Sequence, residues 1–233
     1  MRVSVVLPTF NECDNIGLLI QALRHNLESD HSLQFIVVDD SSTDGTADMA
    51  LPHLDPKVDC LIRRDSSRSL AGSILDGLRV AEYEQVLVMD SDFTHDPKDA
   101  AILLSVAPFC QVSIGSRFVP GGRMESVMHY RASLAYNALI RLVTGSQIRD
   151  NLGGFWTAKI STVSDFFTAE VFTGYGDYFI RLAYLLQRRK TRVIEVPTIF
   201  RNRVTGTSKS NFLFLALSYL KTAIGVRLTR SPR

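Results

Sequence analysis

The chain has 233 residues, of which 45% are hydrophobic and 21% are charged, and its formal net charge is +2. This composition excludes an intrinsically disordered chain, and the length fits one large domain or two small ones. The sequence has no apolar run of about 20 residues, so it predicts no membrane-spanning helix, and the short first apolar run, which ends at Pro8, predicts no signal peptide.

The charge is unevenly distributed along the chain. Glu195 is the last acidic residue, and the Lys and Arg side chains that follow it leave residues 1–195 with a net charge of −5. A basic end on an acidic body favours an anionic partner, such as a phosphate or a membrane surface. No recognition motif supports a nucleic acid, and we predict none as a partner.

Strand and helix patterns alternate over the first 90 residues. Short apolar runs predict buried strands at residues 3–7, 35–38, 58–62 and 86–90. Apolar residues at helical spacing predict helices at residues 15–27 and 69–81. This alternation predicts a parallel sheet with helices on both faces, and right-handed crossovers would bring the ends of the first, second and fourth strands to one rim.

Four carboxylates follow these strands. Glu12 comes after the first strand, Asp40 after the second, and Asp90 and Asp92 after the fourth. Ligands of open α/β sheets bind at the carboxyl ends of the strands. An Asp-x-Asp pair there offers hard oxygen ligands to Mg²⁺ or Mn²⁺, which in turn would bind phosphate oxygens. Each carboxylate alone is also typical of a turn, so the metal prediction depends on their grouping.

The second half of the chain continues the pattern. We predict helices from residue 97, at 130–143 and from 177 to about 188, strands at 112–115 and 192–196, and an extended edge segment at 197–203. Residues 150–156 are glycine-rich and contain the only Trp, and Gly153-Gly154 predict either a close approach of the sugar or a plain turn. Trp156 and Tyr175 are candidates either to flank an acceptor or to pack in the core or at the rim.

Three motifs resemble the inverting family 2 glycosyltransferases with the GT-A fold. They are Pro-Thr-Phe-Asn-Glu at residues 8–12, Val-Asp-Asp-Ser-Ser-Thr-Asp-Gly-Thr at 38–46, and Met-Asp-Ser-Asp at 89–92. The later sequences at 115–118, 196–197, 202–203 and 206–209 are similar to those of polyprenyl-phosphate (dolichyl-phosphate) mannose or glucose synthases. The resemblance implies an α/β catalytic domain over residues 1–211, with a Rossmann-like, mostly parallel sheet.

The resemblance also implies roles for individual residues. Nucleotide-sugar contacts are expected from Pro8, Phe10, Glu12, Val38, Asp40, Ser91, Arg117, Arg203 and Lys209, together with the metal ligands Asp90 and Asp92. The expected catalytic residues are Asp92, Arg117 and Arg203. Arg117 and Arg131 are expected to face the acceptor phosphate.

The implied reaction moves a hexose from GDP-mannose or UDP-glucose to a polyprenyl phosphate, with Mg²⁺ or Mn²⁺ as cofactor. An acceptor hydroxyl would need a general base, for which Asp92 and Asp177 are candidates. The sequence departs from the resembling group at Thr94, at residues 176–180 and at Asn202, which keeps a hydroxyl acceptor open. A non-catalytic nucleotide-sugar binding protein is the other alternative.

The last segment, residues 212–233, is apolar and basic. Residues 212–226 are apolar almost all round, interrupted by Lys221, so they predict either a core helix or a helix in the membrane interface, anchored by Lys221, Arg227 and Arg230. We favour the interfacial helix. Three cysteines without disulfide spacing are typical of a cytosolic protein, and we therefore expect a peripheral protein on the cytoplasmic face of a membrane.

Overall fold

The computed structural model describes residues 1–201 and 212–229 of the chain. Its main sheet consists of β1 (Arg2–Thr9), β2 (Ser32–Asp39), β3 (Cys60–Arg63), β4 (Gln85–Val88), β5 (Val112–Ser116), β7 (Trp156–Lys159) and β8 (Val193–Pro197). The strand order is β3-β2-β1-β4-β7-β5-β8, and the pairs β1·β2, β1·β4, β2·β3 and β5·β8 are parallel. The predicted α/β class and parallel first half are confirmed.

Strand β7 was missed by the sequence analysis, which predicted no strand after the glycine-rich residues 150–156. It begins at Trp156 and pairs antiparallel with β4 on one side and β5 on the other. Trp156 is fully buried, and its indole N–H donates to the Tyr178 hydroxyl at 3.3 Å. Trp156 is therefore a core residue in the middle of the sheet.

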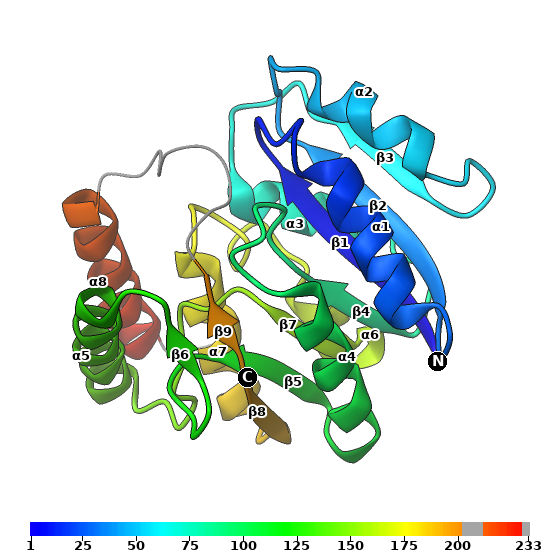
Figure 1. Cartoon of the computed structure of the whole chain (residues 1–233). Helices are drawn as coiled ribbons and strands as arrows, with labels where there is room; N and C mark the ends of the chain where they lie inside the picture. Colours follow the sequence, from blue (N-terminus) through cyan, green and yellow to red (C-terminus); the bar gives the residue numbers. More distant parts are fainter. Residues whose placement is uncertain (202–211, 230–233) are drawn as a thin grey trace.

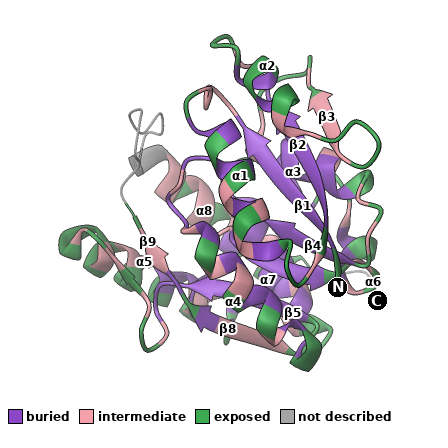
Figure 2. Cartoon of the chain, turned by 45° about the vertical axis from the view of Figure 1, so that its right-hand side comes forward, coloured by how far each residue is buried: buried purple, intermediate pink, exposed green. Residues whose placement is uncertain are grey.

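Helices cover both faces of the sheet (Figure 1). They are α1 (Ile16–Leu27), α2 (Thr46–Ala50), α3 (Leu70–Arg79), α4 (Pro97–Val106), α5 (Val127–Thr144), α6 (Ile160–Val163), α7 (Asp177–Arg188) and α8 (Phe212–Leu228), with short 3₁₀ turns at Leu51–His53, Ala107–Phe109 and Ser164–Phe166. Strand side chains alternate between the two faces. Val5 packs in the core with α1 and α4, whereas Val6 packs in the core with α3 and α7. Figure 2 shows the resulting buried sheet between more exposed helices.

A second layer lies beside the sheet. Helix α8 packs on α5 and α7 around the buried residues Ile140, Ile180 and Ala223, and α5 and α8 lie side by side in Figure 1. The short strands β6 (Arg123–Met124) and β9 (Ile199–Phe200) form a two-stranded parallel sheet. Strand β9 lies in the segment predicted as an extended edge.

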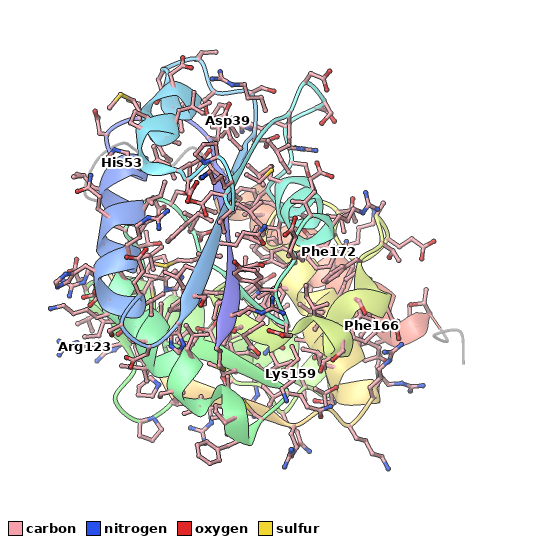
Figure 3. All side chains as sticks on the ribbon, turned by 90° about the vertical axis from the view of Figure 1, so that its right-hand side faces the viewer. Asp39, His53, Arg123, Lys159, Phe166 and Phe172 are labelled. Atoms are coloured by element: carbon pink, nitrogen blue, oxygen red, sulfur yellow. The ribbon has the colours of Figure 1, made fainter. Side chains whose placement is uncertain are left out.

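The strand order brings the expected rim together. Thr9 at the end of β1 pairs with Asp39 at the end of β2, whereas Lys159, at the end of antiparallel β7, pairs with Gln85 at the start of β4. Asp39 and Lys159 therefore mark opposite ends of the sheet (Figure 3).

Candidate functional site at the strand ends

A cleft opens at the carboxyl ends of β1, β2 and β4. Its volume, with the open solvent at its mouth included, is about 730 Å³. The cleft is lined by Pro8, Thr9, Phe10, Glu12, Asp40, Arg68, Leu70, Ser73, Asp90, Ser91, Asp92 and Tyr175. Seven of the residues that the resemblance predicts to contact the nucleotide sugar thus line this cleft: Pro8, Phe10, Glu12, Asp40, Asp90, Ser91 and Asp92.

The turn after β4 holds Asp92 in a fixed orientation. Thr94 donates to Asp92 Oδ1 twice, from its hydroxyl at 2.6 Å and from its backbone N–H at 3.1 Å. The Ser91 hydroxyl donates to the Pro8 carbonyl at 2.6 Å and so ties this turn to the end of β1. Thr94, a departure from the resembling group, thus orients a predicted metal ligand.

The two aspartates fit a divalent cation that binds together with a phosphate ligand. Both line the cleft, and Asp92 is 5% exposed. Within residues 1–201 and 212–229, no cluster of three or more His, Cys, Asp or Glu side chains could hold a metal. Mg²⁺ binds six oxygen ligands and is often held by one or two carboxylates together with substrate phosphates. Asp90 and Asp92 are therefore enough as the protein's ligands.

Asp40 is fixed by an ion pair at the edge of the cleft. It pairs with Arg64, which also donates to Asp76 at 2.8 Å, and it accepts the Ser69 backbone N–H at 2.7 Å. Ser69 is the N-cap of α3. Asp40 therefore joins the end of β2 to the start of α3.

Arg68 is a cleft residue that the sequence analysis missed. Its guanidinium lies over the Phe10 ring at 4.3 Å from the centroid. The only available signal was a basic side chain in the loop between a strand and the N-cap of the next helix. Arg68 and Phe10 together offer a flat, cationic surface suited to an aromatic base or a phosphate.

Arg117 is buried in a bidentate ion pair and is not among the described residues that line the cleft. Its Nε and Nη2 donate to the two Asp150 oxygens, each at 2.7 Å, and its backbone N–H donates to the same carboxylate at 3.1 Å. Burial raises the pKa of Asp150, but the Arg117 charge and hydrogen bonds outweigh it and hold that pKa below its usual value. No motif in the sequence indicated this pairing.

The other predicted residues lie elsewhere. Val38 is fully buried in the core that β2 shares with α3, so its side chain is a packing residue. Arg131 is exposed on α5. Arg203 and Lys209 lie outside the described residues.

His95 is a buried residue in the turn that follows β4. Its ring is buried, 4.7 Å from the Phe155 ring and 5.3 Å from the Phe200 ring by their centroids. Neither ring nitrogen reaches a hydrogen-bond partner at ordinary geometry among residues 1–201 and 212–229. Burial, helped by the Arg117 charge, lowers the pKa of His95 to about 4, so the ring is neutral near pH 7.

Asp177, a candidate acid from the sequence, sits at the start of α7 and is 3% exposed. It accepts the Tyr175 backbone N–H at 2.8 Å and forms an ion pair with Arg181 at 2.8 Å. Tyr175, by contrast, reaches the cleft wall. Through these contacts Asp177 stabilises the conformation of the segment that contains Tyr175.

Comparisons with known proteins agree with the motifs. The model of the family described as Glycosyl transferase family 2 matches residues 4–167. The chain is 32% identical to the undecaprenyl-phosphate mannosyltransferase of Micrococcus luteus, covering 90% of this chain and 87% of that one. It is 31% identical to the polyprenol monophosphomannose synthase of Mycolicibacterium smegmatis, covering 89% of this chain and 80% of that one.

Another relative is longer than this chain. The dolichol-phosphate mannosyltransferase of Pyrococcus furiosus is 28% identical over 90% of this chain, which spans 59% of that protein's length. Among solved structures, glucosyl-3-phosphoglycerate synthase from Mycobacterium tuberculosis, in complex with Mn²⁺ and UDP-glucose, is similar with a TM-score of 0.68. It is 17% identical and covers 96% of this chain and 79% of that one, a likeness of fold.

Proposed function

The chain belongs to the family 2 glycosyl transferases and has the GT-A fold, and on this basis we propose that it transfers a hexose from a nucleotide diphosphate sugar to a polyprenyl phosphate. The observation that carries the proposal is the cleft at the strand ends, which Asp90 and Asp92 line together with Phe10, Glu12 and Asp40. The relatives named above are mannosyltransferases or mannose synthases of polyprenol-type phosphates. Mannose is therefore the first sugar to test.

The donor nucleotide occupies this cleft. Phe10 and Arg68 contact the base, Pro8 and Ser91 line the floor beneath it, and Glu12 and Asp40 lie toward the ribose. The backbone of Val38, whose side chain is in the core, follows the same edge. This assignment is supported by the shared lining of the cleft and by the ring contact between Arg68 and Phe10.

Asp90 and Asp92 hold the divalent cation, Mg²⁺ or Mn²⁺, which as a Lewis acid offsets the charge that develops on the departing diphosphate. Thr94 keeps the Asp92 carboxylate aimed while the donor binds. The similar Mycobacterium tuberculosis structures contain Mn²⁺ or Mg²⁺ with UDP.

A phosphate acceptor is already an anion near neutral pH, so the attacking oxygen needs no strong general base. Arg131, Arg203 and Lys209 provide cations for the donor and acceptor phosphates, because charge-assisted hydrogen bonds to phosphate oxygens are strong. The Nε and Nη2 groups of Arg117 are already engaged by Asp150, so Arg117 contributes its charge and its remaining N–H groups. The contacts of Asp177 with Arg181 and Tyr175 argue against its use as a base. A hydroxyl acceptor is thus the less supported alternative.

The acceptor reaches the site at a membrane surface. Helices α5 and α8 expose apolar side chains, including Leu142 at 82% and Leu228 at 76% exposure, and α8 also carries exposed Lys221 and Arg227. Apolar and basic side chains on one surface bind anionic lipid interfaces. No helix within the described ranges 1–201 and 212–229 combines the length and apolarity needed to span a bilayer. We place the protein peripherally, on the cytoplasmic face, with residues 212–233 as an attachment segment on the catalytic domain.

The experiment is a transfer assay with radiolabelled GDP-mannose and, separately, UDP-glucose. Each donor is incubated with a polyprenyl phosphate or with the corresponding polyprenol, in Mg²⁺ or Mn²⁺. The proposal predicts a labelled lipid with the phosphate acceptor alone. Transfer to the free alcohol at an equal rate would favour a hydroxyl acceptor, and no transfer to either acceptor would contradict the proposal.

A further inference from the structure

The segment 173–177 reaches the cleft on one side. Tyr175 lines the cleft together with Asp90 and Phe10. The carbonyl of the preceding residue, Gly174, accepts the Ser69 hydroxyl at 3.3 Å, and the Ser69 backbone N–H donates to Asp40 in the same cleft. The position of Tyr175 is thus tied to residues that line the proposed nucleotide site.

On its other side the same segment is held by α8. Asp177 Oδ1 accepts the Tyr175 backbone N–H at 2.8 Å, and Oδ2 accepts the Thr222 hydroxyl at 3.2 Å. Arg181 donates to the Thr222 hydroxyl oxygen at 3.2 Å and to the Thr173 carbonyl at 3.0 Å. The Thr222 hydroxyl thus accepts a hydrogen bond from Arg181 and donates one to Asp177. Thr222 therefore links α8 to both side chains.

Two glycines of this segment are packed closely against neighbouring side chains. Gly174 has a positive φ of +81°, and a Cβ there would collide with the Asp177 carboxylate. A Cβ on Gly176 would come within 2.7 Å of the Tyr219 hydroxyl of α8. The backbone therefore lies directly against Asp177 and α8, and a shift of α8 has to move it.

We propose that Asp177 and Thr222 are positioning residues that couple nucleotide binding in the cleft to the docking of α8 on α7. The inference rests on the proposed function, because it takes the cleft as the nucleotide site. Thr222 is not among the described residues that line the cleft, so it acts through Asp177 and Tyr175. Coupling of this kind is reciprocal: α8 in place tightens nucleotide binding, and bound nucleotide tightens the docking of α8 by the same factor.

The test compares Thr222→Val with Thr229→Val. Each substitution removes one hydroxyl, that of Thr222 within α8 and that of Thr229 directly after its last residue. The Thr229 hydroxyl donates to the Gly225 carbonyl at 2.9 Å and not to the 173–177 segment. Dissociation constants for UDP and for GDP, in Mn²⁺, are measured by calorimetry for both variants and the wild type. We expect Thr222→Val to bind whichever nucleotide the wild type binds about fivefold more weakly, the size of one hydrogen bond, and Thr229→Val to match the wild type.

Hydrogen–deuterium exchange of the wild type supplies a second measurement that needs no variant. Saturating nucleotide should slow exchange in the peptides that contain residues 173–177 and in those of α8. Equal nucleotide affinity of the two Thr→Val variants, or unchanged exchange of α8 in a wild type that binds nucleotide, overturns the inference and leaves the proposed function intact. A wild type that binds neither UDP nor GDP contradicts the proposed function itself.

Discussion

At the scale of single residues, Arg117 is a buried cation whose counter-charge, Asp150, is buried with it. Its side chain is 9% exposed, and the Asp150 side chain is fully buried. A buried ion pair contributes little net free energy, but the removal of one partner leaves an uncompensated charge in the interior. Arg117 therefore has a structural task in addition to any contact with phosphate, and variants of it have to be judged by stability as well as by activity.

Arg117→Met should lower the free energy of unfolding by about 3 to 5 kcal/mol, because the Asp150 carboxylate would lose its counter-charge. The double variant Arg117→Met/Asp150→Leu should recover most of that loss. Urea unfolding of the two single variants and the double variant measures the coupling. A single-variant loss below about 1 kcal/mol, the value of exposed pairs, would mean that the pair is not structural.

His95 gives the molecule a predictable sensitivity to acid. Its pKa is about 4 in the folded protein and 6.5 by its ordinary value, so the unfolded chain binds a proton that the native state does not. The stabilisation is fully present above pH 6.5 and is lost as the pH falls toward 4, by up to about 3 kcal/mol.

The variant His95→Phe keeps a ring against Phe155 and Phe200 but cannot titrate. Urea unfolding at about pH 7 and about pH 4.5 should show a smaller loss of stability for this variant than for the wild type, by about 2 kcal/mol. His129→Phe, which alters an exposed ring on α5, is the control and should lose as much as the wild type. Equal losses for all three proteins would show that His95 does not titrate as described.

At the scale of elements, patterns with strong periodicity were predictable, and short elements in glycine-rich sequence were not. The alternating strands and helices up to Val88 appear where the sequence predicts them, because β1, β2 and β4 are buried and mostly apolar. Strand β3, which was predicted as buried, is instead only partly buried. Strand β7 has four residues, follows Gly153 and Gly154, and gains its stability from pairing with β4 and β5. Such long-range pairing leaves no local signal. The predicted helix at 212–226 is present as α8.

Helix α8 has apolar residues both on the face that packs against α5 and α7 and on its exposed face. This explains why its sequence is apolar on almost all sides. Ala223 faces α5 and α7, whereas Leu217, Ile224 and Leu228 are exposed. Deletion of the whole helix would therefore disturb α5 and α7 as well as any membrane contact. Substitutions confined to the exposed face are the cleaner test of attachment.

The triple variant Leu217→Ser/Ile224→Ser/Leu228→Ser should bind vesicles containing anionic phosphatidylglycerol at least about tenfold more weakly, because each exposed apolar side chain contributes to insertion. Sedimentation with the vesicles measures it. The matched control replaces Leu18, Met49 and Leu51, which are similarly exposed near α1 and α2, with Ser. Equal binding by both triple variants would remove α8 from the attachment surface.

At the scale of the whole molecule, the cleft follows from topology. Because β1, β2 and β4 run parallel, the side chains after them meet at one rim, and this is why Glu12, Asp40 and Asp90 were predictable as neighbours. Arg68 and the pairing of Arg117 with Asp150 were not predictable, because they depend on how separate loops pack. The order of the strands thus predicts the position of the functional site, whereas the packing of the loops determines which basic side chains lie near it.

The central claim is that Asp90 and Asp92 hold a divalent cation that binds the donor diphosphate. Its most direct test is calorimetry of UDP and GDP binding in Mn²⁺, in Mg²⁺ and in EDTA, with the wild type and with Asp92→Asn; Asp48→Asn, which alters an exposed partner of Arg63, is the control. We predict that the metal strengthens nucleotide binding to the wild type and to Asp48→Asn by at least about tenfold, and that Asp92→Asn loses this gain while keeping its fold. Nucleotide affinity that is the same with metal and with EDTA, or the same in Asp92→Asn as in the wild type, would contradict the claim.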